Sequence, residues 1–145
     1  MQAQWHHVGI SVADLDRALH FYRDLLGFEV EWDHPQRGGP EMSKVVGLDD
    51  VNAHMVMLRG YGTHIELFDY QSPKGQAVGS GRQCDYGLIH FALTVTGLQG
   101  LYDRLVKEGV EFNCPPQVLR PGVLATYMKD PEGVTIELVE YGEEA

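Results

Sequence analysis

The chain has 145 residues, a length that suits a single domain with its own hydrophobic core. Its 21 acidic and 11 basic residues give a net charge of −10, so nucleic acid and anionic membrane surfaces are not expected partners. No apolar run approaches the roughly 20 residues of a membrane span, and no signal-peptide core opens the chain. We therefore expect a cytoplasmic protein.

The first half of the sequence predicts a strand, a helix and three further strands. Aliphatic residues alternate with His7, Gly9 and Ser11 over residues 7–12, which indicates a half-buried strand. A helical repeat follows from residue 15 to residue 26, with Asp14 as N-cap and Gly27 as the C-terminal stop. The predicted later elements are strands at 28–31, 53–58 and 63–70, a hairpin turn at 60–62 and a loop at 34–42.

The second half repeats this order. Ile89 begins an alternating strand that runs to Val95, and a helical repeat spans residues 98–106. A capping box of Thr96 and Gln99 would start this helix, and Gly109 would end it. The predicted later elements are strands at 110–113, 123–129 and 134–141 and a type I turn at 130–133. The fold class is thus α+β, one domain over 1–145 with tandem βαβββ modules at 1–70 and 88–145, joined by loop 71–87.

Strand parity places four polar side chains on the sheet face away from the helices. If the aliphatic residues of the first strand face the helix, His7 faces the other way and His6 lies on the helix side. The same argument sends Glu66, His90 and Glu137 to the face away from the helices, because each lies between apolar residues of its strand.

Two His and two Glu make a good ligand set for one divalent transition metal. A single His or Glu on a strand is ordinarily a solvated residue. Here, however, both types recur at equivalent positions of the two copies and share one face, where a sheet core would hold apolar groups. We therefore expect a metal site rather than four unrelated surface residues.

The chain resembles the vicinal oxygen chelate superfamily, which includes glyoxalase I, methylmalonyl-CoA epimerase, extradiol dioxygenases and antibiotic-resistance proteins. The resemblance covers nearly the whole chain and rests on five segments: His7-Val8-Gly9-Ile10, Asp14-Leu15 with Phe21-Tyr22, Leu26-Gly27-Phe28, Gly87-Leu88-Ile89-His90, and Asp130-Pro131-Glu132-Gly133-Val134-Thr135-Ile136-Glu137-Leu138.

This resemblance implies a curved eight-stranded sheet around a central metal-binding cup, with His7, Glu66, His90 and Glu137 as ligands. It implies one divalent metal (Ni, Co, Mn, Zn or Fe), no organic cofactor, a small-molecule substrate with vicinal oxygens, and a homodimer. The expected chemistry passes through a metal-stabilised enolate or enediolate, with Glu66 or Glu137 as the catalytic base. His64 shares the face of Glu66 and is a candidate substrate-binding residue.

The number of ligands separates the branches of the superfamily. Extradiol dioxygenases use two His and one Glu, so a fourth ligand at Glu66 favours the lyase, isomerase and epimerase branch. The alternatives are an Fe(II) extradiol-type ring-cleaving dioxygenase and a non-catalytic small-molecule binding or resistance protein. This chain has Ser11 where bacterial glyoxalase I usually carries an Arg for glutathione.

Overall fold

The computed structural model describes residues 1–79, 81–88 and 90–143. The chain divides into two compact units, unit 1 (Met1–Ala77) and unit 2 (Val78–Ala145). Ile89, predicted to open the strand of the second module, and the last two residues of that module lie outside the described residues. Among the described residues, no helix is long and apolar enough to span a membrane.

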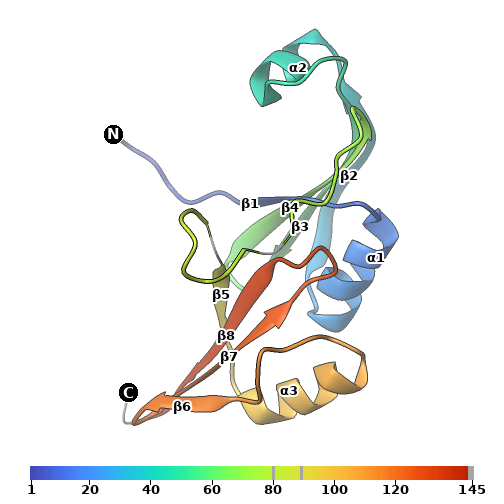
Figure 1. The fold of residues 1–145 in the computed structure, drawn as a ribbon. Helices are drawn as coiled ribbons and strands as arrows, with labels where there is room; N and C mark the ends of the chain where they lie inside the picture. The colour runs from blue at the N-terminus through green and yellow to red at the C-terminus, as the bar shows by residue number, and fades with distance from the viewer. Residues whose placement is uncertain (80, 89, 144–145) are drawn as a thin grey trace. The chain divides into compact units, whose positions relative to one another are not determined.

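Each unit holds one four-stranded sheet with its helices (Figure 1). The strand order is β1-β4-β3-β2 in unit 1 and β5-β8-β7-β6 in unit 2, with the outer pairs β1–β4 and β5–β8 parallel and the others antiparallel. The identical order confirms the predicted α+β duplication. Unit 1 comprises β1 (Val8–Ser11), α1 (Leu15–Leu19), η1 (His20–Leu25), β2 (Glu29–Gly38), α2 (Pro40–Val46), β3 (Asn52–Gly60) and β4 (Thr63–Ser72), and unit 2 comprises β5 (Phe91–Thr94), α3 (Leu98–Lys107), β6 (Gln117–Arg120), β7 (Val123–Lys129) and β8 (Thr135–Tyr141).

The core of unit 1 lies between its sheet and the α1–η1 helix. Ile65 and Leu67 on β4 are directly opposite Leu58 and Val56 on β3, and all four are at most 1% exposed. Tyr22 of η1 is completely buried as well. Burying each such side chain contributes about 1.5–3 kcal/mol. This burial fixes which face of the sheet turns toward the helix, and therefore which face is left for other functions.

The first helix changes its winding half-way. Asp14 caps α1 as predicted, because its Oδ1 accepts a hydrogen bond from the N–H of Arg17 at 3.0 Å. From His20 onward the chain forms the π-helix η1, and the N–H of Leu26 donates to the carbonyl of Phe21, five residues back, at 3.1 Å. Phe21 and Tyr22, at the start of this wider turn, are both buried.

The predicted loop at 34–42 is wrong. β2 continues to Gly38, with His34 paired to Met55 of β3, and α2 begins two residues later at Pro40. The register shift between His34 and Arg37 leaves the non-donating Pro35 unpaired, and pairing resumes at Arg37. The Pro- and Gly-rich composition indicated a loop because it does not reveal the cross-strand partner. Figure 1 shows α2 at the far end of the β2–β3 ribbon from α1.

The strand predicted at 110–113 is also wrong. Only Phe112 forms an isolated bridge, to Met128, and the edge strand of unit 2 is β6 at 117–120. The ring of Phe112 packs edge-to-face on Tyr102 of α3 at 4.8 Å, so this segment passes beneath the helix. The turn at 130–133 is confirmed, because the N–H of Gly133 donates to the carbonyl of Asp130 at 3.0 Å.

The N-terminus of α3 is capped from β8. The predicted capping box is wrong: Gly97 occupies the N-cap position, and Gln99 donates instead to Asp103. The Glu140 carboxylate accepts from the N–H groups of Gly97 at 2.6 Å and Leu98 at 2.9 Å. These two backbone hydrogen bonds hold the pKa of Glu140 below its ordinary value. The cap therefore ties the helix to the last strand of the unit.

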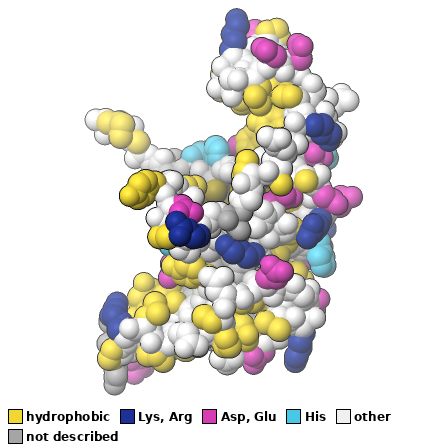
Figure 2. Space-filling view, viewed as in Figure 1, with side chains coloured by type: hydrophobic (Ala, Val, Ile, Leu, Met, Phe, Trp, Pro, Cys, Tyr) yellow, Lys and Arg dark blue, Asp and Glu magenta, His cyan; other side chains and the backbone are white. Residues whose placement is uncertain are grey.

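On the face drawn in Figure 2, Lys and Arg side chains are scattered among acidic and polar ones and form no continuous basic surface. This distribution agrees with the net charge of −10.

Replacing Glu140 by Gln should lower the free energy of unfolding by about 1 kcal/mol near neutral pH, as for the loss of a helix cap. A carboxylate whose pKa is lowered by folding stabilises the folded state at pH values above its pKa in the unfolded chain. This stabilisation is lost as the pH falls through its pKa in the folded protein. The difference between the wild type and Glu140→Gln should therefore narrow below about pH 4. Urea unfolding followed by circular dichroism at several pH values measures it, with the exposed Glu143→Gln as control. A difference in unfolding free energy between the wild type and Glu140→Gln that stays constant across pH would contradict the role of the Glu140 carboxylate as the cap of α3.

Candidate functional site

In unit 1, His7 and Glu66 form a contact pair on the face away from α1. β1 and β4 run parallel with Gly9 beside Glu66, so the residue just before β1 lies close to this carboxylate. His7 Nε2 lies 3.0 Å from Glu66 Oε2, and the side chains are 35% and 10% exposed. Ile65 and Leu67, on either side of Glu66, are buried in the core. The structure brings this pair together as strand parity predicts.

In unit 2, His90 and Glu137 form the equivalent pair. The parallel strands β5 and β8 set Ala92 beside Glu137, again two residues after the His. His90 Nε2 lies 3.2 Å from Glu137 Oε2, and the side chains are 24% and 20% exposed. The same nitrogen meets the same type of oxygen in both units.

The donor set fits a divalent metal. Imidazole nitrogen and carboxylate oxygen both bind such ions at about 2.0–2.2 Å, and two ligand atoms at a right angle about one ion are then about 3.0 Å apart. The observed separations of 3.0 and 3.2 Å match this spacing. Within the ranges 1–79, 81–88 and 90–143, no three His, Cys, Asp or Glu side chains form a group that could hold a metal ion. Each unit thus supplies two potential ligands.

Three further polar side chains form a series of contacts that starts at His7. The ring of His6 stacks on that of His64 with centroids 5.9 Å apart, and His6 Nδ1 lies 2.7 Å from His7 Nδ1. His64 Nε2 lies 3.4 Å from Glu31 Oε2. The prediction that His6 lies on the helix side is wrong, because β1 begins at Val8 and its alternation does not extend back to His6.

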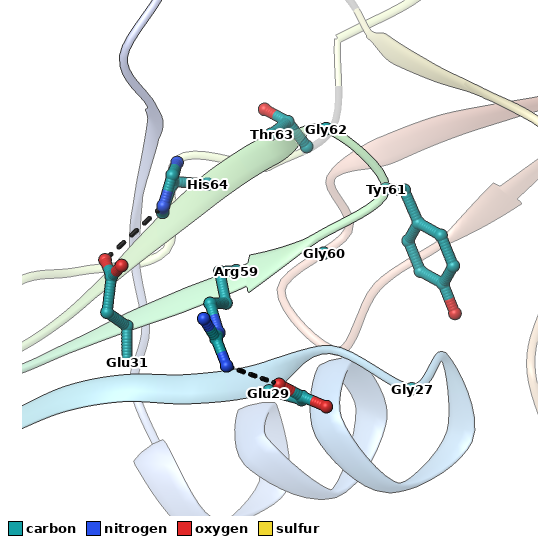
Figure 3. Close-up of a pocket in the computed structure, with 9 residues that line it drawn as sticks. All are labelled: Gly27, Glu29, Glu31, Arg59, Gly60, Tyr61, Gly62, Thr63 and His64. Atoms are coloured by element: carbon teal, nitrogen blue, oxygen red, sulfur yellow. Dashed lines mark hydrogen bonds and ion pairs between the residues drawn. The ribbon is translucent and has the colours of Figure 1, made fainter.

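A pocket of about 550 Å³ opens beside His64 at the β3–β4 turn. Arg59 pairs with His64 across β3 and β4, so both share the face of Glu66. Figure 3 shows Arg59 directed toward Glu29, with Nη2 2.9 Å from Oε2, and His64 directed toward Glu31. The pocket therefore offers both hydrogen-bond donors and acceptors, which suits a small polar molecule. Its lining residues are Gly27, Glu29, Glu31, Arg59, Gly60, Tyr61, Gly62, Thr63 and His64.

Each candidate carboxylate has a tyrosine nearby that the choice of site residues from sequence missed. Tyr127 pairs with Glu137 across β7 and β8, and its ring lies 5.0 Å from that of His90. Burial, and then the charge of Glu137, raise the pKa of Tyr127. Burial, and then Glu66, raise the pKa of Tyr70. Both phenols are therefore protonated donors at neutral pH. Tyr70 could have been found by parity, because it follows Glu66 by four residues on one strand.

A hydrogen-bonded chain continues from His90 through unit 2. Gln83 Oε1 lies 3.1 Å from His90 Nδ1, and Gln83 Nε2 donates to Thr135 Oγ1 at 3.0 Å. Thr135 Oγ1 also accepts from the ammonium of Lys129. Gln83 lies in the segment that joins the two modules, where the sequence carries no periodic pattern to place it.

Residues 4–138 match the glyoxalase/bleomycin resistance protein/dioxygenase superfamily. The chain belongs to this superfamily. The resemblance stated from sequence is thereby confirmed, and the two four-stranded units agree with the fold of superfamily structures. A glyoxalase family protein from Bacillus cereus superposes with a TM-score of 0.88 at 23% identity, over 97% of this chain and 95% of that one.

Two relatives of the chain have enzyme names. The chain is 31% identical over 142 residues to a 2-epi-5-epi-valiolone epimerase from Actinomyces sp.. The matched segment covers 92% of this chain and 77% of the relative. It is 27% identical over 137 residues to a probable lactoylglutathione lyase from Synechocystis sp., with 92% of each chain covered.

Replacing Glu137 by Gln should lower the pKa of Tyr127, because a neighbouring negative charge disfavours the phenolate. The pKa should stay above its ordinary value, since burial persists. Nuclear magnetic resonance (NMR) titration of tyrosine labelled with ¹³C at Cζ measures the change, with Tyr70 as internal control. The matched variant Glu66→Gln should move Tyr70 and leave Tyr127 unchanged. Equal movement of both tyrosines in either variant would show that the charges do not act locally.

Proposed function

We propose that this protein is a metal-dependent lyase, isomerase or epimerase of the glyoxalase type, acting on a small molecule with vicinal oxygens. The observation that carries the proposal is the repeated pair in which a His Nε2 faces a Glu Oε2, at 3.0 Å in unit 1 and 3.2 Å in unit 2. The names of the two relatives, an epimerase and a lyase, support the same reaction class.

The proposed ligands of one divalent metal are His7, Glu66, His90 and Glu137, with each unit contributing one imidazole and one carboxylate. When bound, the metal polarises a substrate carbonyl and thereby acidifies the neighbouring C–H group. The presence of Glu66 beside His7 supports a lyase or epimerase over a ring-cleaving dioxygenase, which needs only two His and one carboxylate.

Proton transfer is assigned to the two glutamates. An Oε atom of Glu66 or Glu137 takes the proton from the carbon next to the carbonyl, and an enolate-type intermediate results. Delivery of a proton to the opposite face of that carbon by the other glutamate, in its protonated form, gives epimerisation. Two carboxylates that each lie beside a histidine at a similar distance suit this two-base reaction. The protonated phenols of Tyr70 and Tyr127 donate hydrogen bonds to substrate oxygens or to the carboxylates.

Epimerisation of a polar carbonyl compound is the reaction we favour within this class. Ser11 is a small exposed residue and offers no cation for a glutathione carboxylate. The pocket beside His64 provides Arg59 and His64 as donors and Glu29 and Glu31 as acceptors. Such a mixed lining suits a substrate with several hydroxyl groups, in agreement with the name of the epimerase relative. His64 is the proposed substrate-binding residue among these.

Metal binding tests the ligand set. Isothermal titration of the untagged, metal-free protein with Ni²⁺, Co²⁺, Mn²⁺, Zn²⁺ or anaerobic Fe²⁺ should give about one ion per chain for at least one metal. His90→Ala and Glu66→Ala should each weaken binding at least about 100-fold, since even partners of the ligands contribute 10–100-fold. His20→Ala, on the exposed side of η1, is the control. Unchanged affinity in the His90→Ala, Glu66→Ala double variant would refute the ligand set.

Exchange of substrate hydrogen with solvent tests the reaction class. In D₂O, polyhydroxylated ketones should lose the proton signal beside the carbonyl when the metal-loaded protein is present. Glu66→Gln or Glu137→Gln should slow this exchange by roughly 10²–10⁴-fold, the usual contribution of a general base. Proton NMR follows the reaction. Absence of exchange across the panel, together with oxygen consumption on catechols under Fe²⁺, would favour the dioxygenase alternative.

A further inference from the structure

The two candidate metal-binding histidines are held at both ring nitrogens. In each, Nε2 faces a glutamate, and Nδ1 faces a second group outside the proposed ligand set. That second group is His6 Nδ1 for His7, at 2.7 Å, and Gln83 Oε1 for His90, at 3.1 Å. The second ring nitrogen thus contacts a different residue in each copy.

The contact to Gln83 defines which ring nitrogen of His90 is available to bind a metal. A side-chain amide oxygen can only accept, so the Nδ1 of His90 must carry the proton in this hydrogen bond. With Nδ1 engaged in this hydrogen bond, Nε2 faces the Glu137 carboxylate, which is itself an acceptor, and Nε2 is the ring nitrogen that can share a cation with it. The opposite tautomer would set two acceptors, Nδ1 and Oε1, against each other.

The orientation of the Gln83 amide is set by its other end. Its Nε2 donates to Thr135 Oγ1 at 3.0 Å, and Thr135 is only 4% exposed. The Lys129 ammonium is a pure donor and already occupies one lone pair of that oxygen. Thr135 accepts from Gln83 through its remaining lone pair, so the amide presents its oxygen to His90. Lys129, Thr135 and Gln83 therefore form one directed chain that ends on the histidine ring.

We propose that Gln83 is a positioning residue that holds His90 with Nδ1 protonated and Nε2 directed at Glu137. Metal-binding histidines commonly donate their second ring N–H to a fixed acceptor, which orients the ring and strengthens its other nitrogen as a ligand. The hydrogen bond from His90 to Gln83 is a property of the protein without metal. The effect of Gln83 on metal affinity, in contrast, rests on the proposed function.

The first test needs no metal. The ¹H–¹⁵N NMR spectrum of the metal-free, histidine-labelled protein should show an Nδ1–H resonance of His90 protected from exchange with water. Gln83→Met, similar in size but without an acceptor, should lose this resonance. Gln83→Glu, which keeps the acceptor, should retain it, as should the control Gln99→Met on α3. A resonance unchanged in Gln83→Met, or absent from the wild type, overturns the proposal.

The second test measures the effect of Gln83 on metal affinity. Gln83→Met should weaken the metal affinity 10–100-fold, as for other partners of metal ligands, and Gln83→Glu should restore most of it. Circular dichroism confirms that each variant is folded. Wild-type protein that binds no metal would refute the proposed function, while the Nδ1–H resonance would still decide the role of Gln83. Wild-type protein that binds metal with an affinity unaffected by Gln83→Met would refute the positioning role alone.

Discussion

The parallel pairing of the outer strands is the interaction on which each half of this protein depends. β1 lies beside β4, and β5 beside β8, in a register that places a histidine just before one strand next to a glutamate in the middle of the other. Parallel neighbours need a long connection, which the helix and the intervening strands provide. The His–Glu pair is therefore a product of the whole βαβββ unit and not of a local motif.

In unit 1, one face of the sheet holds the apolar core and the other holds the candidate metal ligands. In unit 1, Val56, Leu58, Ile65 and Leu67 fill the helix-facing side and leave Glu66 on the other. Glu66 is nevertheless only 7% exposed, and burial of a carboxylate is costly unless a proton donor or a cation compensates it. His7 supplies that compensation at 3.0 Å. A cation bound at this position would offset the charge of Glu66 in the same way.

Duplication has preserved the pairs while their surroundings have diverged. His7 is contacted by His6, which stacks on His64 beside the pocket. His90 is contacted by Gln83, which is hydrogen-bonded to Thr135, and Thr135 accepts from Lys129. Lys129 brings a positive charge into the surroundings of His90, and Glu31 brings a negative charge next to His64. The two His–Glu pairs are therefore alike in geometry, while the charged groups near them differ.

The sequence by itself determined the duplicated fold and the four candidate ligands. Alternation of apolar residues predicts the face of each strand side chain, and recurrence of His and Glu at equivalent positions of the two copies selects His7, Glu66, His90 and Glu137 on that face. Only the tertiary structure decided the role of His6, the continuation of β2 through Pro35, the cap supplied by Glu140 and the contact of Gln83 with His90. Each of these depends on a partner distant in the chain or on backbone outside a regular strand, where periodicity no longer constrains direction.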